Sequence, residues 1–202
     1  AHNQSNVRCS TEASLRALRG ILDWPWQFAP QACVTAAIAT SFGCSLQGDV
    51  PQTQVCALAA QLAEAKVAEI TLADTVGYAN PRQVKRLFQA VATEVGDVPL
   101  AAHFHDTRSM GLTNVLAALD CGISKFDAAL AGLGGCPFAP GASGNIATED
   151  TVYMLETMGL RTSIDLDALL RLREDFARWL PEEPLQGRLG IAGIARNFTP
   201  AT

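Results

Sequence analysis

The sequence predicts an α/β fold in which about four strand–helix units follow one another along 202 residues. Short apolar runs of strand length alternate with longer segments whose apolar residues recur at helical spacing. Strands that are joined by crossover helices lie parallel in one sheet. Four such units amount to half of a (β/α)₈ barrel, which takes about 250 residues. An open doubly wound sheet has the same alternation, so the pattern alone does not choose between the two architectures.

The strands are predicted from apolar runs that turns or charged helices separate. The first run, ACVTAAIAT, has few charges, and we therefore expect a strand that is buried on both faces. The later runs are shorter, and polar residues follow each of them. The four predicted strands comprise residues 32–40, 69–72, 99–105 and 125–130.

The helices are predicted from apolar periodicity and from residues that favour helix ends. Thr11 is expected to cap the first helix, and Asn80-Pro81 is expected to start another, because Asn is a favoured cap and Pro a favoured first residue. Residues 1–10 and the segment after Trp179 are expected to be irregular. The predicted helices comprise residues 11–21, 51–65, 81–91, 112–120, 148–158 and 167–179.

The composition excludes several classes of protein. The formal net charge is −5 and no basic stripe is present, which argues against a nucleic-acid partner. No apolar run approaches about 18 residues, so no membrane span is expected. The six cysteines include no CxxC pair and are expected to be reduced thiols. This favours an intracellular protein, cytoplasmic or, in a eukaryote, mitochondrial.

The sharpest local signal is His103-Phe104-His105, at the end of the third predicted strand. Side chains alternate along a strand, so both imidazoles lie on the same face. Two imidazoles on one face suit two ligands of one metal ion. The alternative is one buried, hydrogen-bonded histidine and one surface histidine.

Other candidate residues follow the predicted strands, where parallel α/β sheets carry their active sites. Five glycines lie between Gly132 and Gly144, and Cys136 among them is a candidate acid or base. The alternative is a loose loop with an incidental thiol. Asp74 is either a general base or a turn residue. Glu149 either serves catalysis or interacts with the N-terminal dipole of the predicted helix 148–158.

These residues lie in segments that resemble the hydroxymethylglutaryl-CoA lyases, a family of barrel metallolyases. The resemblance runs in order from about Asn3 to Leu160, and the last segment is long and specific. The matching segments are Ser41-Phe-Gly-Cys-Ser-Leu-Gln-Gly48, Leu72-Ala-Asp-Thr75, Ala102-His-Phe-His-Asp-Thr107 and GLGGCPFAPGASGNIATED from Gly132 to Asp150.

The resemblance implies a metal-assisted lyase that splits 3-hydroxy-3-methylglutaryl-CoA into acetyl-CoA and acetoacetate. It implies Mg²⁺ or Mn²⁺ as the cofactor and an acyl-CoA as the small-molecule partner. The roles implied are metal ligation by His103, His105 and Asn145, catalysis by Cys136, His103 and Asp74, substrate contact by Asp74, Thr75 and Gly135, and support of the site by Glu149.

One part of the family pattern has no match in this sequence. The family carries an Arg-Asp pair on its first strand, whose Asp is a further metal ligand, whereas residues 1–10 match the loop after the fourth strand. We therefore expect residues 1–202 to form a single partial barrel domain, namely the C-terminal half with strands five to eight. Three neutral ligands without a carboxylate should bind a hard cation weakly.

Three alternatives stay open at this point. The chain could act on another branched 3-hydroxyacyl-CoA, because part of the acyl pocket lies outside it. It could be a related Claisen-type synthase or aldolase, although those enzymes lack the GGCP segment. It could also be a non-catalytic half barrel that associates through its open edges, and such edges make a homodimer plausible.

Overall fold

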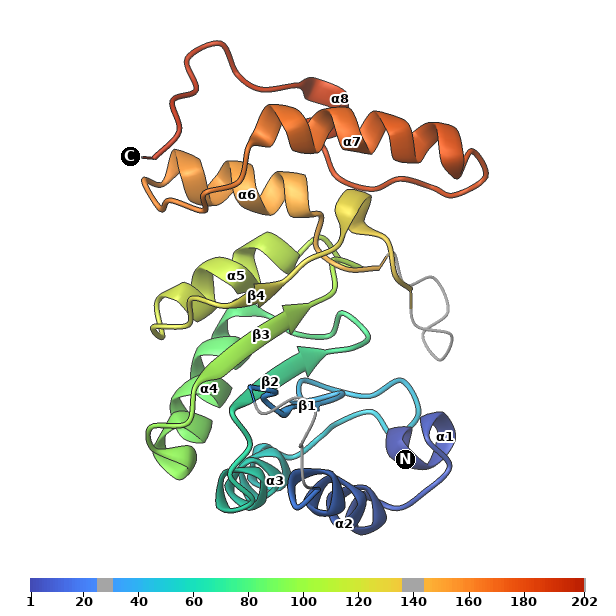
Figure 1. Cartoon of the computed structure of the whole chain (residues 1–202), viewed down its shortest axis with the longest axis vertical. Helices are drawn as coiled ribbons and strands as arrows, with labels where there is room; N and C mark the ends of the chain where they lie inside the picture. The colour runs from blue at the N-terminus through green and yellow to red at the C-terminus, as the bar shows by residue number, and fades with distance from the viewer. Residues whose placement is uncertain (25–30, 136–143, 202) are drawn as a thin grey trace.

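A parallel sheet forms the centre of the molecule. The computed structural model describes residues 1–24, 31–135 and 144–201. The strands lie in the order β1-β2-β3-β4, and each adjacent pair is parallel (Figure 1). The predicted α/β class with parallel strands is confirmed. The strand bounds are Thr35–Ile38 for β1, Glu69–Asp74 for β2, Leu100–Phe104 for β3 and Phe126–Asp127 for β4.

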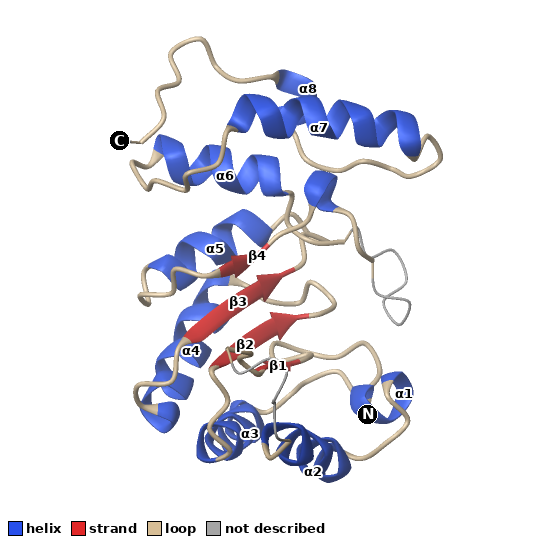
Figure 2. Cartoon of the chain, viewed as in Figure 1, coloured by secondary structure: helices blue, strands red, loops and turns tan. Residues whose placement is uncertain are grey.

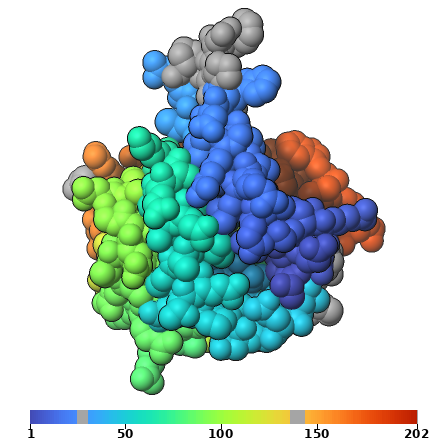
Figure 3. Space-filling model, turned by 90° about the horizontal axis from the view of Figure 1, so that it is seen from below, coloured from blue at the N-terminus to red at the C-terminus, as the bar shows by residue number. Residues whose placement is uncertain are grey.

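The helices α3, α4 and α5 connect the strands and cover one face of the sheet (Figure 2). The helices α6 and α7 lie beyond the β4 end of the sheet. From below, α2, α3 and α4 follow one another across the surface (Figure 3). The predicted helices are all present, with ends shifted by a few residues. Their bounds are Thr11–Leu22 for α2, Gln52–Glu64 for α3, Pro81–Val95 for α4, Gly111–Leu119 for α5, Thr148–Thr157 for α6 and Leu166–Trp179 for α7.

The core lies between the sheet and the covering helices. Leu72 and Phe104 point from β2 and β3 into it, and both are fully buried. Helix α4 contributes Val84 and Phe88 from its apolar face. Asn80 caps this helix as predicted, because its side-chain oxygen accepts a hydrogen bond from the Gln83 N–H at 3.0 Å.

The two edge strands differ from the prediction. β1 is shorter than residues 32–40, and it is not buried on both faces, since Thr35 and Ala37 are exposed. β4 consists of only two residues, after which the chain turns into the short 3₁₀ helix Leu130–Gly132. Each of these strands has a single neighbour in the described sheet, so the ladder that would extend and bury it is missing on one side.

The N-terminal residues also differ from the prediction. The predicted loop contains the helix α1, His2–Asn6, which the Asn3 side chain ties to α2 by donating to Ser14 Oγ at 2.9 Å. Ser10, not Thr11, caps α2, because its backbone is extended and its Oγ accepts from the Ala13 N–H. A cavity of about 340 Å³ separates α2 from α3 beside β1.

The C-terminal segment is irregular as predicted, except for the one-turn helix α8, Leu189–Ala192. The five cysteines in the described parts of the chain are free thiols. Within those same parts, no helix combines the length and the apolar character that a bilayer crossing requires.

Candidate active site

The site lies at the carboxyl end of β3, where a second segment runs antiparallel to it. Asn145 forms a β-bridge with His105. The Ile146 N–H donates to the Phe104 carbonyl at 3.1 Å, and the Asp106 N–H donates to the Gly144 carbonyl at 3.0 Å. These backbone bonds bring two of the predicted metal ligands side by side, although 40 residues separate them in sequence.

The two histidines face each other, as the alternation along β3 predicts. The centroids of the His103 and His105 rings are 5.2 Å apart and the rings are tilted by 52°. His105 is buried, and this burial, together with the nearby His103, lowers the pKa of His105 to about 4. Its imidazole is therefore neutral at neutral pH, the form in which a ring nitrogen can bind a metal ion.

Asp127 is a site residue that the sequence did not reveal. It is the register partner of His103 across β3 and β4, and its Oδ2 lies 3.4 Å from His103 Nδ1. A carboxylate beside one ring nitrogen of a ligating histidine orients the ring and leaves the other nitrogen for the metal. Its place on the strand next to His103 could have indicated it, but this place is known only once the register between β3 and β4 is known.

Unpartnered buried atoms test whether these residues fit a metal ion. His105 Nδ1 and Asn145 Oδ1 are both buried without a hydrogen-bond partner, whereas Asn145 Nδ2 donates to the Leu133 carbonyl at 2.7 Å. A buried polar atom without a partner costs free energy, and coordination of a cation is one way in which such atoms are satisfied. In the described chain no three His, Cys, Asp or Glu side chains gather around one point, so the set depends on the Asn145 amide.

The glycines of the loop let the backbone approach Asn145 closely. Gly144 has φ +94°, and a Cβ there would lie 2.2 Å from the Gly132 carbonyl oxygen. Gly134 has φ +101°, and a Cβ there would lie 2.6 Å from Asn145 Nδ2. A side chain at Gly134 would displace the Asn145 amide, and one at Gly144 would push residues 144 and 132 apart, which explains why glycine stands at these two positions.

Replacing Gly144 by Ala is expected to destabilise the fold by more than the same change at Gly122. Gly122 has a similar φ, +83°, but no atom lies within 4 Å of a Cβ there. The Gly122→Ala variant therefore has backbone strain alone, about 1–3 kcal/mol, whereas Gly144→Ala has that strain and a clash with backbone. Urea unfolding of both variants measures the difference. Equal losses of unfolding free energy in the two variants would show that residues 144 and 132 are not in close contact.

Asp74 and Thr75 hold the loops at the ends of β1 and β2. The Asp74 carboxylate is fully buried and accepts from the Tyr78 N–H at 2.8 Å and the Ala79 N–H at 3.1 Å. Asp74 pairs in register with Phe104, a core residue, and not with His103. Thr75 Oγ1 accepts from the Thr40 N–H at 2.9 Å. The geometry shows the turn role of Asp74, and its contact with substrate stays a prediction.

Asp74 should make stability depend on pH. Burial raises its pKa to about 6, although the Tyr78 and Ala79 N–H groups and Arg108 oppose the rise. A carboxyl whose folded pKa is above its unfolded value of about 3.9 stabilises the fold fully below about pH 4, and this contribution is lost as the pH rises through about 6. Two pKa units correspond to about 3 kcal/mol.

The Asp74→Asn variant tests this, because the amide does not ionise. The unfolding free energy of the wild type minus that of the variant should fall by about 3 kcal/mol between about pH 4 and pH 7.5. Taking the difference cancels the titration of other groups. A difference that does not change with pH would contradict a raised pKa for Asp74.

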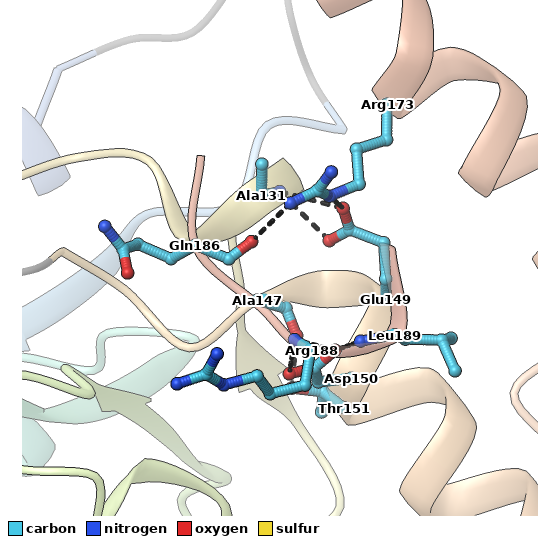
Figure 4. A network of polar contacts seen from close by, with 9 residues as sticks. All are labelled: Ala131, Ala147, Glu149, Asp150, Thr151, Arg173, Gln186, Arg188 and Leu189. Atoms are coloured by element: carbon cyan, nitrogen blue, oxygen red, sulfur yellow. Dashed lines mark hydrogen bonds and ion pairs between the residues drawn. The ribbon is translucent and has the colours of Figure 1, made fainter. Parts of the chain in front are cut away.

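Glu149 is buried at the start of α6 and both of its carboxylate oxygens accept from the Ala131 N–H, at 3.1 and 2.9 Å. Its Oε1 also lies 3.0 Å from Arg173 Nε in an ion pair (Figure 4). Glu149 therefore holds the turn 130–132, from which the glycine-rich segment continues. Gly135 is exposed in that segment, and Cys136 lies outside the described residues.

Comparison with known proteins places the chain in a family. Residues 1–176 match the HMGL-like family of proteins. The chain belongs to the HMGL-like family. Hydroxymethylglutaryl-CoA lyase YngG of Bacillus subtilis is 43% identical over 192 residues, which are 93% of this chain and 62% of that protein. The hydroxymethylglutaryl-CoA lyase of Pseudomonas mevalonii is 38% identical over 98% of this chain and 64% of its own length.

A solved structure agrees with this assignment. An HMG-CoA lyase of Acinetobacter baumannii, in complex with coenzyme A and 3-methylmalate, superimposes with a TM-score of 0.89 at 43% identity. The match covers 98% of this chain and 64% of that one. The resemblance seen in the sequence is thus confirmed, together with the barrel family of the fold. This HMGL-like chain spans somewhat less than two thirds of the length of these relatives.

Proposed function

We propose that this HMGL-like chain carries the His103, His105 and Asn145 part of the metal site of a carbon–carbon lyase acting on 3-hydroxy-3-methylglutaryl-CoA. The observation that carries the proposal is that the two imidazoles and Asn145 lie side by side. Two buried atoms in this group, His105 Nδ1 and Asn145 Oδ1, have no hydrogen-bond partner. The curated names of relatives at 38–43% identity support the choice of reaction and of an acyl-CoA substrate.

The four parallel strands are proposed to be strands five to eight of the (β/α)₈ barrel. Their order, β1-β2-β3-β4, is that of successive barrel strands, and both edges of this sheet lack a neighbour among the described residues. The chain covers 62–64% of the relatives, which leaves part of a full barrel outside it. An acidic ligand and a substrate-binding arginine would then come from the remaining strands of the barrel.

The residues suit the proposed chemistry. A divalent cation of the Mg²⁺ or Mn²⁺ type, when bound, acidifies the hydroxyl of the substrate and orients it. His103, which Asp127 orients, is proposed as the base for the proton that leaves this hydroxyl, a role that requires a ring nitrogen not bound to the metal at that moment. As the C2–C3 bond breaks, its electrons form the thioester enolate and the hydroxyl carbon becomes the ketone of acetoacetate. The Cys136 thiol is proposed to protonate the enolate to acetyl-CoA.

The remaining site residues are proposed to shape the substrate pocket. Asp74 and Thr75 would contact the acyl-CoA through the loops they hold, since the Asp74 carboxylate is already engaged by two N–H groups. Gly135 is proposed to let the acyl chain approach the backbone. Glu149 supports the segment that carries Asn145.

Release of acetoacetate from 3-hydroxy-3-methylglutaryl-CoA tests the proposal. The assay compares the chain alone with the chain mixed with the part of the Bacillus subtilis relative that it does not span, each with Mg²⁺ or Mn²⁺. Metal-dependent release that His105→Ala abolishes is expected. A stable complex that binds coenzyme A but releases no acetoacetate would overturn the proposal. Size-exclusion chromatography of the chain alone would show whether the open edges pair it as a homodimer instead.

A further inference from the structure

Arg173 of α7 joins three separate parts of the chain. Its side chain is 11% exposed, and its Nε lies 3.0 Å from Glu149 Oε1. Its Nη2 donates to the Gln186 carbonyl at 2.8 Å. The guanidinium also lies against Gly190, where a Cβ would come within 2.4 Å of Arg173 Cζ. The guanidinium therefore occupies a niche shaped for it (Figure 4).

Residues 184–190, which we call the strap, attach to the same region at two points. The Gln186 N–H donates to the Ala131 carbonyl at 2.8 Å. The Asp150 carboxylate accepts from the Arg188 N–H at 3.0 and 2.7 Å and from the Leu189 N–H at 2.8 Å. The strap lies beyond residue 176, where the match to the family model ends, although similarity to individual relatives covers 98% of the chain.

Ala131 is the point on which these contacts converge. It is fully buried and has φ 55°, a left-handed conformation that is strained for a residue with a side chain. Glu149 holds its N–H and Gln186 holds its carbonyl. Two residues later, the Leu133 carbonyl accepts from Asn145 Nδ2. The hydrogen bond that orients the Asn145 amide therefore depends on how the Ala131 peptide is held.

We propose that Arg173 is a positioning residue for Asn145. Together with the strap it fixes the turn 130–133, so that Asn145 Nδ2 is engaged and Oδ1 stays free for a cation. The assignment of Oδ1 as a ligand rests on the proposed function, whereas the orientation of the amide does not. Arg173 is proposed to act through other residues, since its polar contacts in the described parts of the chain are with Glu149 and the strap.

A cavity beside Asn145 indicates what release of the strap would do. It measures about 270 Å³ and is lined by Asn145 and Asp150 on one side and by Gln186, Gly187 and Arg188 of the strap on the other. Without the strap this space would be more widely open to water. Water would then compete for the Asn145 amide and for the Leu133 carbonyl, and the amide would lose its fixed orientation.

The Asn145 side-chain amide gives a direct readout by NMR. Its proton signals are assigned by their loss in Asn145→Ala, and their exchange rate is measured without metal. In Arg173→Met we expect exchange at least about 10-fold faster, because the bond to Leu133 is no longer held closed. Arg178→Met is the matched control, since it removes a surface arginine of α7 that pairs with Asp175. Its exchange rate should stay within about twofold of the wild type.

Two milder variants keep the test decisive where Arg173→Met does not fold. Arg173→Lys keeps a charge beside Glu149 but cannot also reach the Gln186 carbonyl, so an intermediate rate is expected. Asp150→Ala frees the other end of the strap and leaves the Glu149–Arg173 pair intact, and it should also speed exchange. Unchanged exchange in every folded variant of this set would overturn the proposal.

Mn²⁺ titration of the same samples separates this inference from the proposed function. Weaker binding in Arg173→Met, by about 10–100-fold, is expected for the loss of an outer support of a ligand. A wild type that shows the expected exchange rates but binds no Mn²⁺, even when mixed with the complementary part of the Bacillus subtilis relative, would refute the metal site alone. A wild type whose Mn²⁺ affinity and amide exchange are both unaffected by Arg173→Met would refute the positioning role alone.

Discussion

Replacing His105 by Ala is expected to weaken Mn²⁺ binding to this HMGL-like chain by at least about 100-fold, since changes that only support a ligand already cost 10–100-fold. The substitution removes the imidazole that is buried beside Asn145 and that has an unpartnered nitrogen. Isothermal titration of Mn²⁺ into both proteins measures the loss. Because burial lowers the pKa of His105 to about 4, the wild type should need no deprotonation of this ring near neutral pH.

His2→Ala is the matched control for this titration. His2 is the remaining histidine of the sequence and is also buried, but it lies in α1 and not on the sheet. Its loss should leave the Mn²⁺ affinity unchanged. If both variants bound Mn²⁺ as the wild type does, His105 would not be a ligand. Equal weakening in both would instead indicate a general loss of structure.

Local patterns in the sequence predicted the parts of the site that one strand determines. His103 and His105 share a face because side chains alternate along any strand, whatever surrounds it. Asn80-Pro81 predicted the start of α4 because capping is a local hydrogen bond. The helical structure of every segment that connects two strands followed from apolar periodicity in the same way.

Long-range backbone pairing determined the rest, and a single sequence does not contain it. Asn145 reaches His105 through an antiparallel bridge that no alternation signals. Asp127 contacts His103 because β4 pairs with β3 in one particular register. The short, exposed β1 could not be predicted from its apolar run, since burial depends on whether a neighbouring strand is present.

The network around Glu149 shows why a residue's role can be visible when its partners are not. Glu149 was recognisable from its place before a helix and from the family motif. Arg173, 24 residues later, lies on a helix whose periodicity predicts only which face packs. The strap brings backbone groups and no distinctive side chain to the site. Backbone donors and acceptors are the same at every position, so they leave no trace in the sequence.

Replacing Glu149 by Ala is expected to destabilise the chain by about 3–5 kcal/mol, the range seen when one partner of a buried ion pair is removed. Glu149 is 1% exposed and Arg173 is 11% exposed, so the arginine would keep an unpaired charge away from water. The Ala131 N–H would also lose both of its acceptors. Urea unfolding followed by circular dichroism measures the loss.

Glu174→Ala serves as the control, because Glu174 is the exposed neighbour of Arg173 on α7. A surface change of this kind should stay within about 0.5 kcal/mol of the wild type. Glu149→Gln should fall between the two, since the amide keeps an oxygen for the Ala131 N–H but has no charge for Arg173. If Glu149→Ala cost no more than Glu174→Ala, the buried pair would not stabilise the fold. The turn 130–133 would then be held by the strap alone, and Asn145 should keep its orientation in the Glu149 variants.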